Sequence, residues 1–246
     1  MDRLVYVAMT GAKEILQAQA VNNANLANAS TVGFRADLSA FQTQQVVGAG
    51  LPSRAYATDA SIGWDSSSGT LQTTGRALDV AIRGPGWLAV QASDGTEAYT
   101  RSGDLKLDAN GLLTTALGNP VLGDTGPITV PPQSAIAVGA DGSVSIVPQG
   151  QPVQSISTVG RLKLVNPPDA QLTRGADGLF RSTDGKPVVA DANVRLAPGT
   201  LESSNVNLAE TMATMIELAR NYEVQVKTMK AAEDNASTSS KLLQPS

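Results

Sequence analysis

Residues 205–243 read NVNLAETMATMIELARNYEVQVKTMKAAEDNASTSSKLL and contain neither Gly nor Pro. A set of positions recurs along this stretch at alternating steps of four and three residues. This spacing is typical of a helix that packs lengthwise on other helices. We call them the C-terminal seam: Leu208, Met212, Met215, Ala219, Tyr222, Val226 and Met229, continuing through Glu233, Ala236, Ser240 and Leu243. Such a helix would be about 58 Å long at 1.5 Å per residue, longer than one small domain. The stretch therefore predicts a partner that is another long helix, with an amphipathic helix packed on its own domain as the alternative.

The start of this helix is marked by Asn207, which is followed three residues later by Glu210. This spacing is typical of an N-terminal capping pair, with Asn in place of the usual Ser or Thr. Pro198 and Gly199 stand just before it and favour a chain break.

The N-terminal segment, MDRLVYVAMTGAKEILQAQAVNN, also predicts a helix. It lacks the uninterrupted apolar core of a signal peptide, and the chain has no apolar run of 18 residues that would span a membrane. The same spacing recurs here in an N-terminal seam: Val5, Ala8, Ala12, Ile15, Gln19, Asn22 and Leu26. Helices at the two ends could pair with each other or with copies from other subunits.

The Asn-rich stretch after this seam is unusual for a helix interior, because Asn competes for backbone hydrogen bonds. Four Asn fall within seven residues, at Asn22, Asn23, Asn25 and Asn28. They predict either a helix end or hydrogen bonding across a close helix interface, with a solvated polar face as the alternative. Gly33 then permits an unusual backbone angle.

The middle of the chain predicts β structure. Residues 44–77 show little periodicity, which predicts an extended connector with one short strand pair, or alternatively a plain flexible linker. From Leu78, short strands alternate with turn signals such as Asp94-Gly95, Asn110-Gly111 and Asp141-Gly142. This spacing favours an antiparallel sandwich or irregular barrel.

The composition argues against an enzyme and against a nucleic-acid-binding protein. The chain has no His and no Cys, and its net charge is −4 with no basic run. Carboxylates that could suggest glycoside hydrolysis are Asp104, Asp108, Asp177 and Asp184. All but Asp104 lie at or beside Gly-containing turns, where Asp is the expected residue. We therefore predict no catalytic site, no cofactor and no metal.

Two blocks of sequence resemble the bacterial flagellar rod and hook proteins. The first is Asn25-Leu26-Ala27-Asn28 followed by Thr31-Val32-Gly33-Phe34-Arg35, where the family has Lys in place of Arg35. The second is Leu201-Glu202-Ser203-Ser204-Asn205-Val206-Asn207, and shorter blocks in the β region bring the resemblance to nearly the whole chain.

The resemblance implies that the protein is a structural subunit of the basal-body rod, which lies in the periplasm. It implies the proximal part of the rod, and the distal part is the alternative. It implies that the terminal helices assemble as coiled coils into a hollow shaft that transmits torque and encloses an export channel. The implied partners are other copies of the chain, neighbouring rod proteins and the flagellar type III export apparatus. The resemblance also implies that the protein is exported without cleavage of a signal peptide. A periplasmic peptidoglycan-binding module is the alternative from another class.

These expectations divide the chain at 1–40 (helical assembly segment), 41–77 (connector), 78–199 (central β domain) and 200–246 (helical assembly segment). The fold class is mainly β with terminal α-helices. The expected subunit interface comprises Val5, Ala8, Ala12, Ile15, Leu26, Asn28, Phe34, Leu208, Met212, Met215, Ala219, Tyr222, Val226 and Met229.

Overall fold

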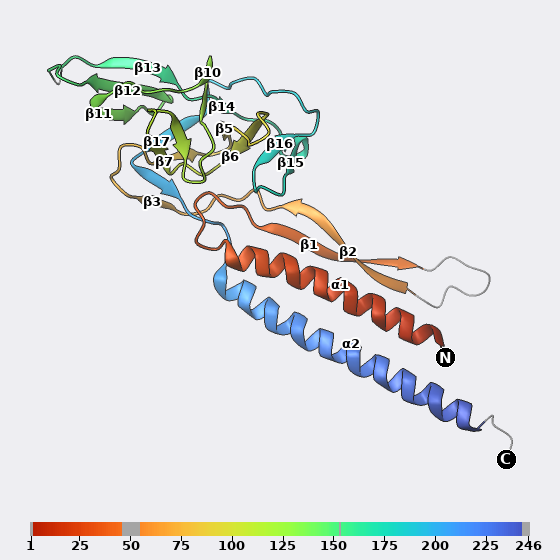
Figure 1. Ribbon diagram of the computed structural model, residues 1–246. Helices are drawn as coiled ribbons and strands as arrows, with labels where there is room; N and C mark the ends of the chain where they lie inside the picture. Colours follow the sequence, from red (N-terminus) through yellow and green to blue (C-terminus); the bar gives the residue numbers. More distant parts are fainter. Residues whose placement is uncertain (1, 46–54, 153, 243–246) are drawn as a thin grey trace. The chain divides into compact units, whose positions relative to one another are not determined.

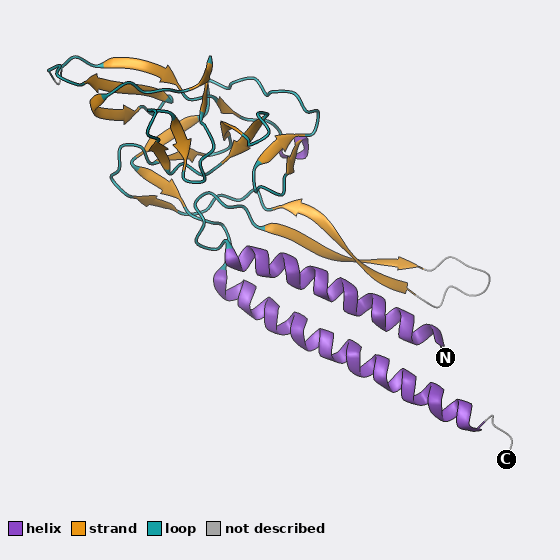
Figure 2. Cartoon of the chain, viewed as in Figure 1, coloured by secondary structure: helices purple, strands orange, loops and turns teal. Residues whose placement is uncertain are grey.

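The computed structural model describes residues 2–45, 55–152 and 154–242. The chain folds into two units, each built from separated stretches of sequence. The helical unit comprises residues 1–29, 36–65 and 206–246, and the β unit comprises residues 30–35 and 66–205. Figures 1 and 2 show the long helices and one hairpin in the first unit and the remaining strands in the second.

Two long helices dominate the helical unit and confirm the prediction of a helix at each end. Helix α1 (Asp2–Ala27) and helix α2 (Leu208–Leu242) lie side by side and run in opposite directions (Figure 1). Their apolar contact includes Ile15, Ala18 and Leu218, with Tyr222 packed against them. Of the two pairings predicted, the structure shows the one within a single chain.

Local hydrogen bonds explain where the helices begin and end. Asn207 Oδ1 accepts the backbone N–H groups of Ala209 and Glu210, at 3.2 and 3.4 Å, so Asn207 is the predicted N-cap of α2. Just after the C-terminal end of α1, Asn28 Nδ2 donates to the Ala24 carbonyl at 2.9 Å. This bond satisfies a carbonyl of the last turn of α1.

A hairpin of strands β1 (Asp37–Gln45) and β2 (Ala55–Trp64) completes the helical unit and packs against α1. The strands pair antiparallel from Asp37 opposite Trp64 to Gln45 opposite Ala55, with one register shift between Leu38 and Ser39. It occupies much of the stretch for which the sequence predicts an extended connector. Its strands are rich in Gln, Ala, Ser and Thr, so they lack the hydrophobic alternation that marks a half-buried strand.

The β unit holds short strands, and every pairing among its described residues is antiparallel. The largest sheet has five strands in the order β14-β5-β6-β16-β15, and another has the order β11-β12-β13. The elements are β3 (Leu71–Thr73), β4 (Val80–Arg83), β5 (Trp87–Gln91), β6 (Glu97–Thr100), β7 (Leu105–Leu107), β8 (Leu113–Thr115), β9 (Leu122–Gly123), β10 (Gly126–Pro127), β11 (Gln133–Val138), β12 (Ser143–Pro148), β13 (Ser157–Arg161), β14 (Leu164–Val165), the 3₁₀ helix η1 (Asp169–Gln171), β15 (Leu172–Arg174), β16 (Phe180–Ser182), β17 (Arg195–Pro198) and β18 (Thr200–Glu202).

Three predicted turns join neighbouring strands in this unit. Gly95, Gly111 and Gly142 have φ angles of 82°, 77° and 86° in the turns between β5 and β6, β7 and β8, and β11 and β12. The left-handed region that these turns require favours Gly, which is why the Asp-Gly and Asn-Gly pairs identify the hairpins in the sequence.

One continuous apolar core stabilises the β unit. It draws on Val80, Ile82, Leu88, Val90, Ala92, Ala98, Leu105, Leu113, Val121, Ile128, Val130, Val138, Val144, Ile146, Leu162, Leu164, Leu179, Val194 and Leu196. Because the core joins residues from β4 through β17, the unit has a hydrophobic centre of its own.

The last two strands of the β unit pair with its first two. Strand β17 pairs with β4, from Arg195 opposite Arg83 to Pro198 opposite Val80, and β18 pairs with β3. The β unit therefore extends beyond the predicted limits of 78 and 199 at both ends, and it also takes in residues 30–35.

Candidate functional site

Helix α2 carries two apolar stripes, one buried within the chain and one exposed. The inner stripe holds the buried residues Thr211, Leu218 and Ala232. The outer stripe, as we name it, consists of Leu208, Met212, Ile216, Ala219 and Val226, and these positions fall within a sector of about 80° around the helix. The exposed fractions of Leu208, Met212 and Ile216 are 48, 49 and 56%. A chain that leaves this stripe open offers an apolar surface to a partner.

The predicted C-terminal seam straddles the boundary between the two stripes. Met215, Tyr222 and Met229 are partly buried, whereas Leu208, Met212, Ala219 and Val226 are exposed. The heptad pattern finds the apolar side of the helix, but it does not distinguish the part covered by α1 from the part left open.

The predicted N-terminal seam lies on the inner side of α1. Ala8, Ala12 and Ile15 are buried, and Val5, Leu26 and Asn28 are partly buried. Among the side chains of α1 that the structure describes, the large exposed apolar ones are Tyr6, Met9 and Leu16, at 53, 52 and 49%, and they occupy a different sector of the helix. Sequence reasoning missed these three because their spacing follows no sustained heptad.

Two Asn side chains of the motif make specific contacts inside the helical unit. Asn22 Nδ2 donates to the Thr211 carbonyl of α2 at 2.9 Å in a buried setting, which confirms that an amide of this motif hydrogen-bonds across a helix interface. Asn25 pairs with the backbone of Asp37: its Nδ2 donates to the Asp37 carbonyl at 2.9 Å, and its Oδ1 accepts the Asp37 N–H at 2.8 Å. The Asn25 side chain thereby imitates a strand partner at the start of β1.

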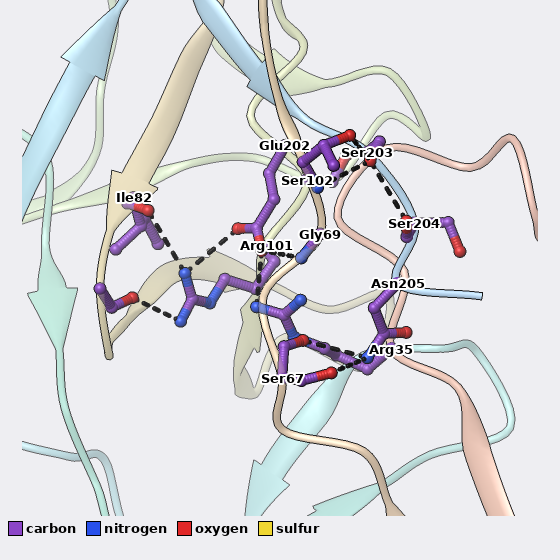
Figure 3. A network of polar contacts seen from close by, with 12 residues as sticks. Arg35, Ser67, Gly69, Ile82, Arg101, Ser102, Glu202, Ser203, Ser204 and Asn205 are labelled. Atoms are coloured by element: carbon purple, nitrogen blue, oxygen red, sulfur yellow. Dashed lines mark hydrogen bonds and ion pairs between the residues drawn. The ribbon is translucent and has the colours of Figure 1, made fainter. Parts of the chain in front are cut away.

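The β unit contains a buried cluster of two arginines and one glutamate (Figure 3). Arg35 Nη2 lies 2.7 Å from Glu202 Oε1, and Arg101 Nη1 lies 3.2 Å from Glu202 Oε2. The Arg35 and Glu202 side chains are 0% exposed, and the Arg101 side chain is 4% exposed. We call these three residues the Arg–Glu–Arg cluster; it carries one more positive than negative charge.

Further hydrogen bonds hold the members of the cluster in place. Arg101 Nη2 donates to the Gly84 carbonyl at 2.8 Å, and the Gly69 N–H donates to Glu202 Oε1 at 3.1 Å. Burial lowers the pKa of Arg101 from its usual value, and the nearby Glu202 carboxylate opposes that shift. Nε and Nη1 of Arg35 have no hydrogen-bond partner among the described residues, so Glu202 is the main compensation for its buried charge.

The backbone beside the cluster is packed so closely that a side chain has no room at Gly33. Its φ is 68°, and an added Cβ would lie 2.3 Å from the Arg101 carbonyl carbon. The Gly33 N–H donates to the Glu202 carbonyl at 2.8 Å. Gly33 is therefore required both for its backbone angle and for the close approach of three chain segments.

Phe34 anchors the same segment from its other side. The Arg174 guanidinium carbon lies 4.3 Å from the centre of the Phe34 ring, and Arg174 Nη1 donates to the Arg35 carbonyl at 2.8 Å. The Asn205 N–H in turn donates to the Phe34 carbonyl at 3.3 Å. Phe34, expected at a subunit interface, thus makes its described contacts inside the β unit.

The candidate carboxylates are held in turns or by neighbouring side chains. Asp108 Oδ1 accepts the N–H groups of Asn110 and Leu112, at 2.9 and 2.7 Å, and Asp177 forms a bidentate pair with Arg181. Asp104 accepts a hydrogen bond from the Ser102 hydroxyl at 2.5 Å. Across the part of the chain that the structure describes, no three Asp or Glu residues gather as a metal site. Within that same part, neither long helix has an apolar stretch suited to crossing a lipid bilayer.

Comparison with known proteins places these features in a family. Residues 81–146 match the family model "Flagellar hook protein FlgE/F/G D1 domain", and residues 197–242 match "Flagellar basal body rod FlgEFG protein C-terminal". The flagellar basal-body rod protein FlgF of Escherichia coli K12 is 44% identical over 99% of both chains, and FlgF of Salmonella typhimurium LT2 is 43% identical over the same share. The rod protein FlgG of Bacillus subtilis 168 is 32% identical over 95% of this chain and 96% of its own. The chain therefore belongs to the FlgE/F/G family of flagellar rod and hook proteins, with FlgF basal-body rod proteins as relatives over almost its whole length.

Proposed function

We propose that this structural subunit of the flagellar basal-body rod polymerises through its terminal helices. The observation that carries the proposal is the outer stripe of α2, where Leu208, Met212 and Ile216 are about half exposed on a helix whose inner stripe is already covered by its own chain. The helical unit has further exposed apolar residues on α1 and on β1: Tyr6, Met9, Leu16, Leu38 and Phe41. Burying them against neighbouring subunits removes apolar area from water and drives association.

In this proposal the helix pair of one subunit packs on the helix pairs of others as coiled coils and forms a hollow shaft. The shaft transmits torque and encloses an export channel, and the β unit contributes further contacts. Its partners are other copies of the chain, neighbouring rod proteins and the flagellar type III export apparatus, which delivers it without a cleaved signal peptide. The FlgF proteins of Escherichia coli and Salmonella typhimurium are 44 and 43% identical to the chain, against 32–34% for FlgG relatives from Buchnera and Bacillus, and this difference supports the proximal part of the rod.

A charge on the outer stripe tests the proposal. Met212→Asp places a carboxylate at a position that is 49% exposed in the single chain, so the subunit itself tolerates it. Between subunits the same carboxylate would be buried without a partner, at a cost of several kcal/mol. Asn221→Asp is the matched control, because it adds the same charge at an exposed position of α2 outside the outer stripe.

Each variant is expressed in cells of a flagellated bacterium from which the native gene has been deleted. We expect Met212→Asp to give normal amounts of folded protein but no swimming and no rods in purified basal bodies, and Asn221→Asp to restore both. Normal swimming with Met212→Asp would contradict polymerisation through this stripe.

A further inference from the structure

Helix α1 has an exposed face that neither α2 nor the hairpin covers. We call it the outer face of α1; its residues are all exposed and fall within a sector of about 80°. Asn22, which bonds to α2, and Asn25, which bonds to Asp37 at the start of β1, lie outside this sector. The outer face of α1 comprises Tyr6, Met9, Lys13, Leu16, Ala20 and Ala24. Apart from Lys13 it is apolar, so burial of this face against a partner would be favourable.

The outer face of α1 and the outer stripe of α2 have the same spacing when the two helices are antiparallel. Read from its C-terminal end, the outer face occupies positions 24, 20, 16, 13, 9 and 6. Read from its N-terminal end, the outer stripe, together with Glu223 in the same sector, occupies positions 208, 212, 216, 219, 223 and 226. Both series step by four, four, three, four and three residues. The two surfaces can therefore meet level by level along about 27 Å of helix.

The side chains at matching levels complement one another. The pairs are Ala24 with Leu208, Ala20 with Met212, Leu16 with Ile216, Lys13 with Ala219, Met9 with Glu223 and Tyr6 with Val226. Each level has at least one apolar side chain, and at the first two levels a small residue lies opposite a large one. Such alternation lets the side chains of two helices interdigitate.

The charges of the two surfaces are opposite and fall on adjacent levels. Lys13 and Glu223 would lie across the contact with an axial offset of four residues, about 6 Å, which long side chains can span. Neither residue forms an ion pair with another residue that the structure describes. Two outer faces of α1 would bring two Lys13 side chains together, and two outer stripes would leave Glu223 without a cation on the opposite stripe. Charge therefore favours a contact of α1 with α2.

We propose that the outer face of α1 is the docking site for the outer stripe of α2 from a second copy of this chain, packed antiparallel, with Lys13 and Glu223 paired across the contact. Because the two surfaces differ, one copy uses both at once, and the contact extends into an open assembly. Helices α1 and α2 are also antiparallel within one chain, so successive copies point in the same direction, as a shaft requires. The proposal rests on the proposed function, since it names the partner of the outer stripe.

Cysteine cross-linking tests which surfaces meet, because the chain has no cysteine of its own. Ala20→Cys and Met212→Cys are combined in the full-length protein, which is expressed as the sole copy in flagellated cells. Within one chain these sites lie apart, because Ala20 is about 160° around α1 from Asn22, which faces α2. Basal bodies are purified and oxidised, and the products are separated by electrophoresis without reductant. Ala20→Cys with Glu217→Cys is the matched control, because Glu217 is exposed on α2 outside the outer stripe.

We expect the double variant to give a ladder of covalent dimers, trimers and larger species, and the single variants and the control to remain monomeric. Dimers from Met212→Cys alone would show that the outer stripe pairs with itself. A double variant that stays monomeric inside assembled rods would show that another protein covers the stripe. Either result would overturn the inference and leave the proposed function standing.

Exchange of the two charges provides a second test that needs no cysteine. Lys13→Glu and Glu223→Lys should each lower the number of rods per cell about tenfold, because like charges then face each other across the contact. The protein with both changes should assemble like the parent, and Glu217→Lys alone should have no effect. If both single variants assembled normally, or if the double variant assembled no better than they do, the inference would be wrong. Normal swimming with Met212→Asp would instead count against the proposed function itself.

Discussion

Arg35 and Glu202 form a fully buried ion pair, with 2.7 Å between Nη2 and Oε1, across most of the length of the chain. The same carboxylate binds Arg101 at 3.2 Å. Removing one partner of a buried pair leaves an uncompensated charge, which destabilises a protein more than the pair itself stabilises it. The stability of the β unit therefore depends on two residues that are far apart in the sequence, Arg35 and Glu202.

Glu202→Gln is expected to lower the free energy of unfolding of the β unit by about 3–5 kcal/mol, because Arg35 and Arg101 both lose their counter-charge. Urea denaturation followed by Trp87 fluorescence in a Trp64→Phe background measures the change. Glu217→Gln makes the same change at an exposed position of α2. Its free energy of unfolding should stay within about 0.5 kcal/mol of that of the parent protein. Equal effects of the two substitutions would show that the buried carboxylate has no special role.

Gly33→Ala is expected to destabilise the β unit by at least about 2 kcal/mol more than Gly75→Ala. The two glycines have similar φ angles, 68° and 74°, so Ala suffers similar backbone strain at each. They differ in space: a Cβ at Gly33 meets the Arg101 carbonyl carbon at 2.3 Å, whereas a Cβ at Gly75 meets no atom within 4 Å. Denaturation of the two variants side by side isolates the steric part, and equal losses would refute the close approach.

Asn25→Ala is expected to cost about 1–3 kcal/mol, because two hydrogen bonds to the Asp37 backbone are lost. Asn23→Ala makes the same change at an exposed position of α1 and gains helix propensity without losing those bonds. Amide hydrogen exchange at Asp37 should accelerate in the first variant and not in the second. Unchanged protection of that amide in Asn25→Ala would mean that the side chain does not hold the start of β1.

Leu218→Ala and Met212→Ala separate the inner stripe of α2 from the outer one. Leu218 is 6% exposed and packs with Ile15 and Ala18, so its truncation should cost about 2–5 kcal/mol in the thermal unfolding of the monomer. Met212 is 49% exposed, and its truncation should leave the monomer nearly unchanged. If both variants melted like the parent protein, the pairing of α1 with α2 would contribute nothing to the stability of the single chain.

The ion pair of Asp177 with Arg181 predicts a small dependence of stability on pH. Hydrogen bonds and charge attraction from Arg181 hold the pKa of Asp177 below its usual value. Its folded pKa is thus lower than its unfolded pKa, so the stabilisation is present above about pH 4 and is lost as pH falls through the folded value. Because the carboxylate is 35% exposed, the effect should be about 0.5 kcal/mol.

Asp177→Asn tests this dependence, because it keeps an acceptor for the Leu179 N–H and removes the charge. The parent and the variant should differ in free energy of unfolding at neutral pH and converge in acid. A difference that persists unchanged in acid would point to the shape of the turn and not to its charge.

Local signals in the sequence predicted the parts of the fold that depend on neighbouring residues. Asn207 caps α2 as its position before an amphipathic stretch suggests, and Asn110-Gly111 turns between β7 and β8. The pairing of β17 with β4 and of β18 with β3 joins residues far apart in the chain, and neither strand carries a pattern that names its partner. Such pairings are decided by the shared core and not by local preference.

The functional residues divide in the same way. Periodicity located the apolar side of α2, but the covered and open parts of that side differ by a rotation that only the packing of α1 decides. Arg35 and Glu202 stand in the motifs that signalled the family, yet nothing local distinguishes a buried arginine from a solvated one. Their pairing becomes visible when residues 30–35 are seen inside the β unit.

The chain crosses between its two units at 29/30, 35/36, 65/66 and 205/206, so neither unit is one continuous piece of sequence. This has a consequence for recombination and for protein engineering. Exchanging residues 66–205 with those of a relative would leave the parental Gly33, Phe34 and Arg35 facing a foreign Glu202 and Arg174. A successful chimera must therefore move the six residues 30–35 together with the long segment. In evolutionary terms, a short piece of the N-terminal region is inherited with the β unit and not with the helix that precedes it.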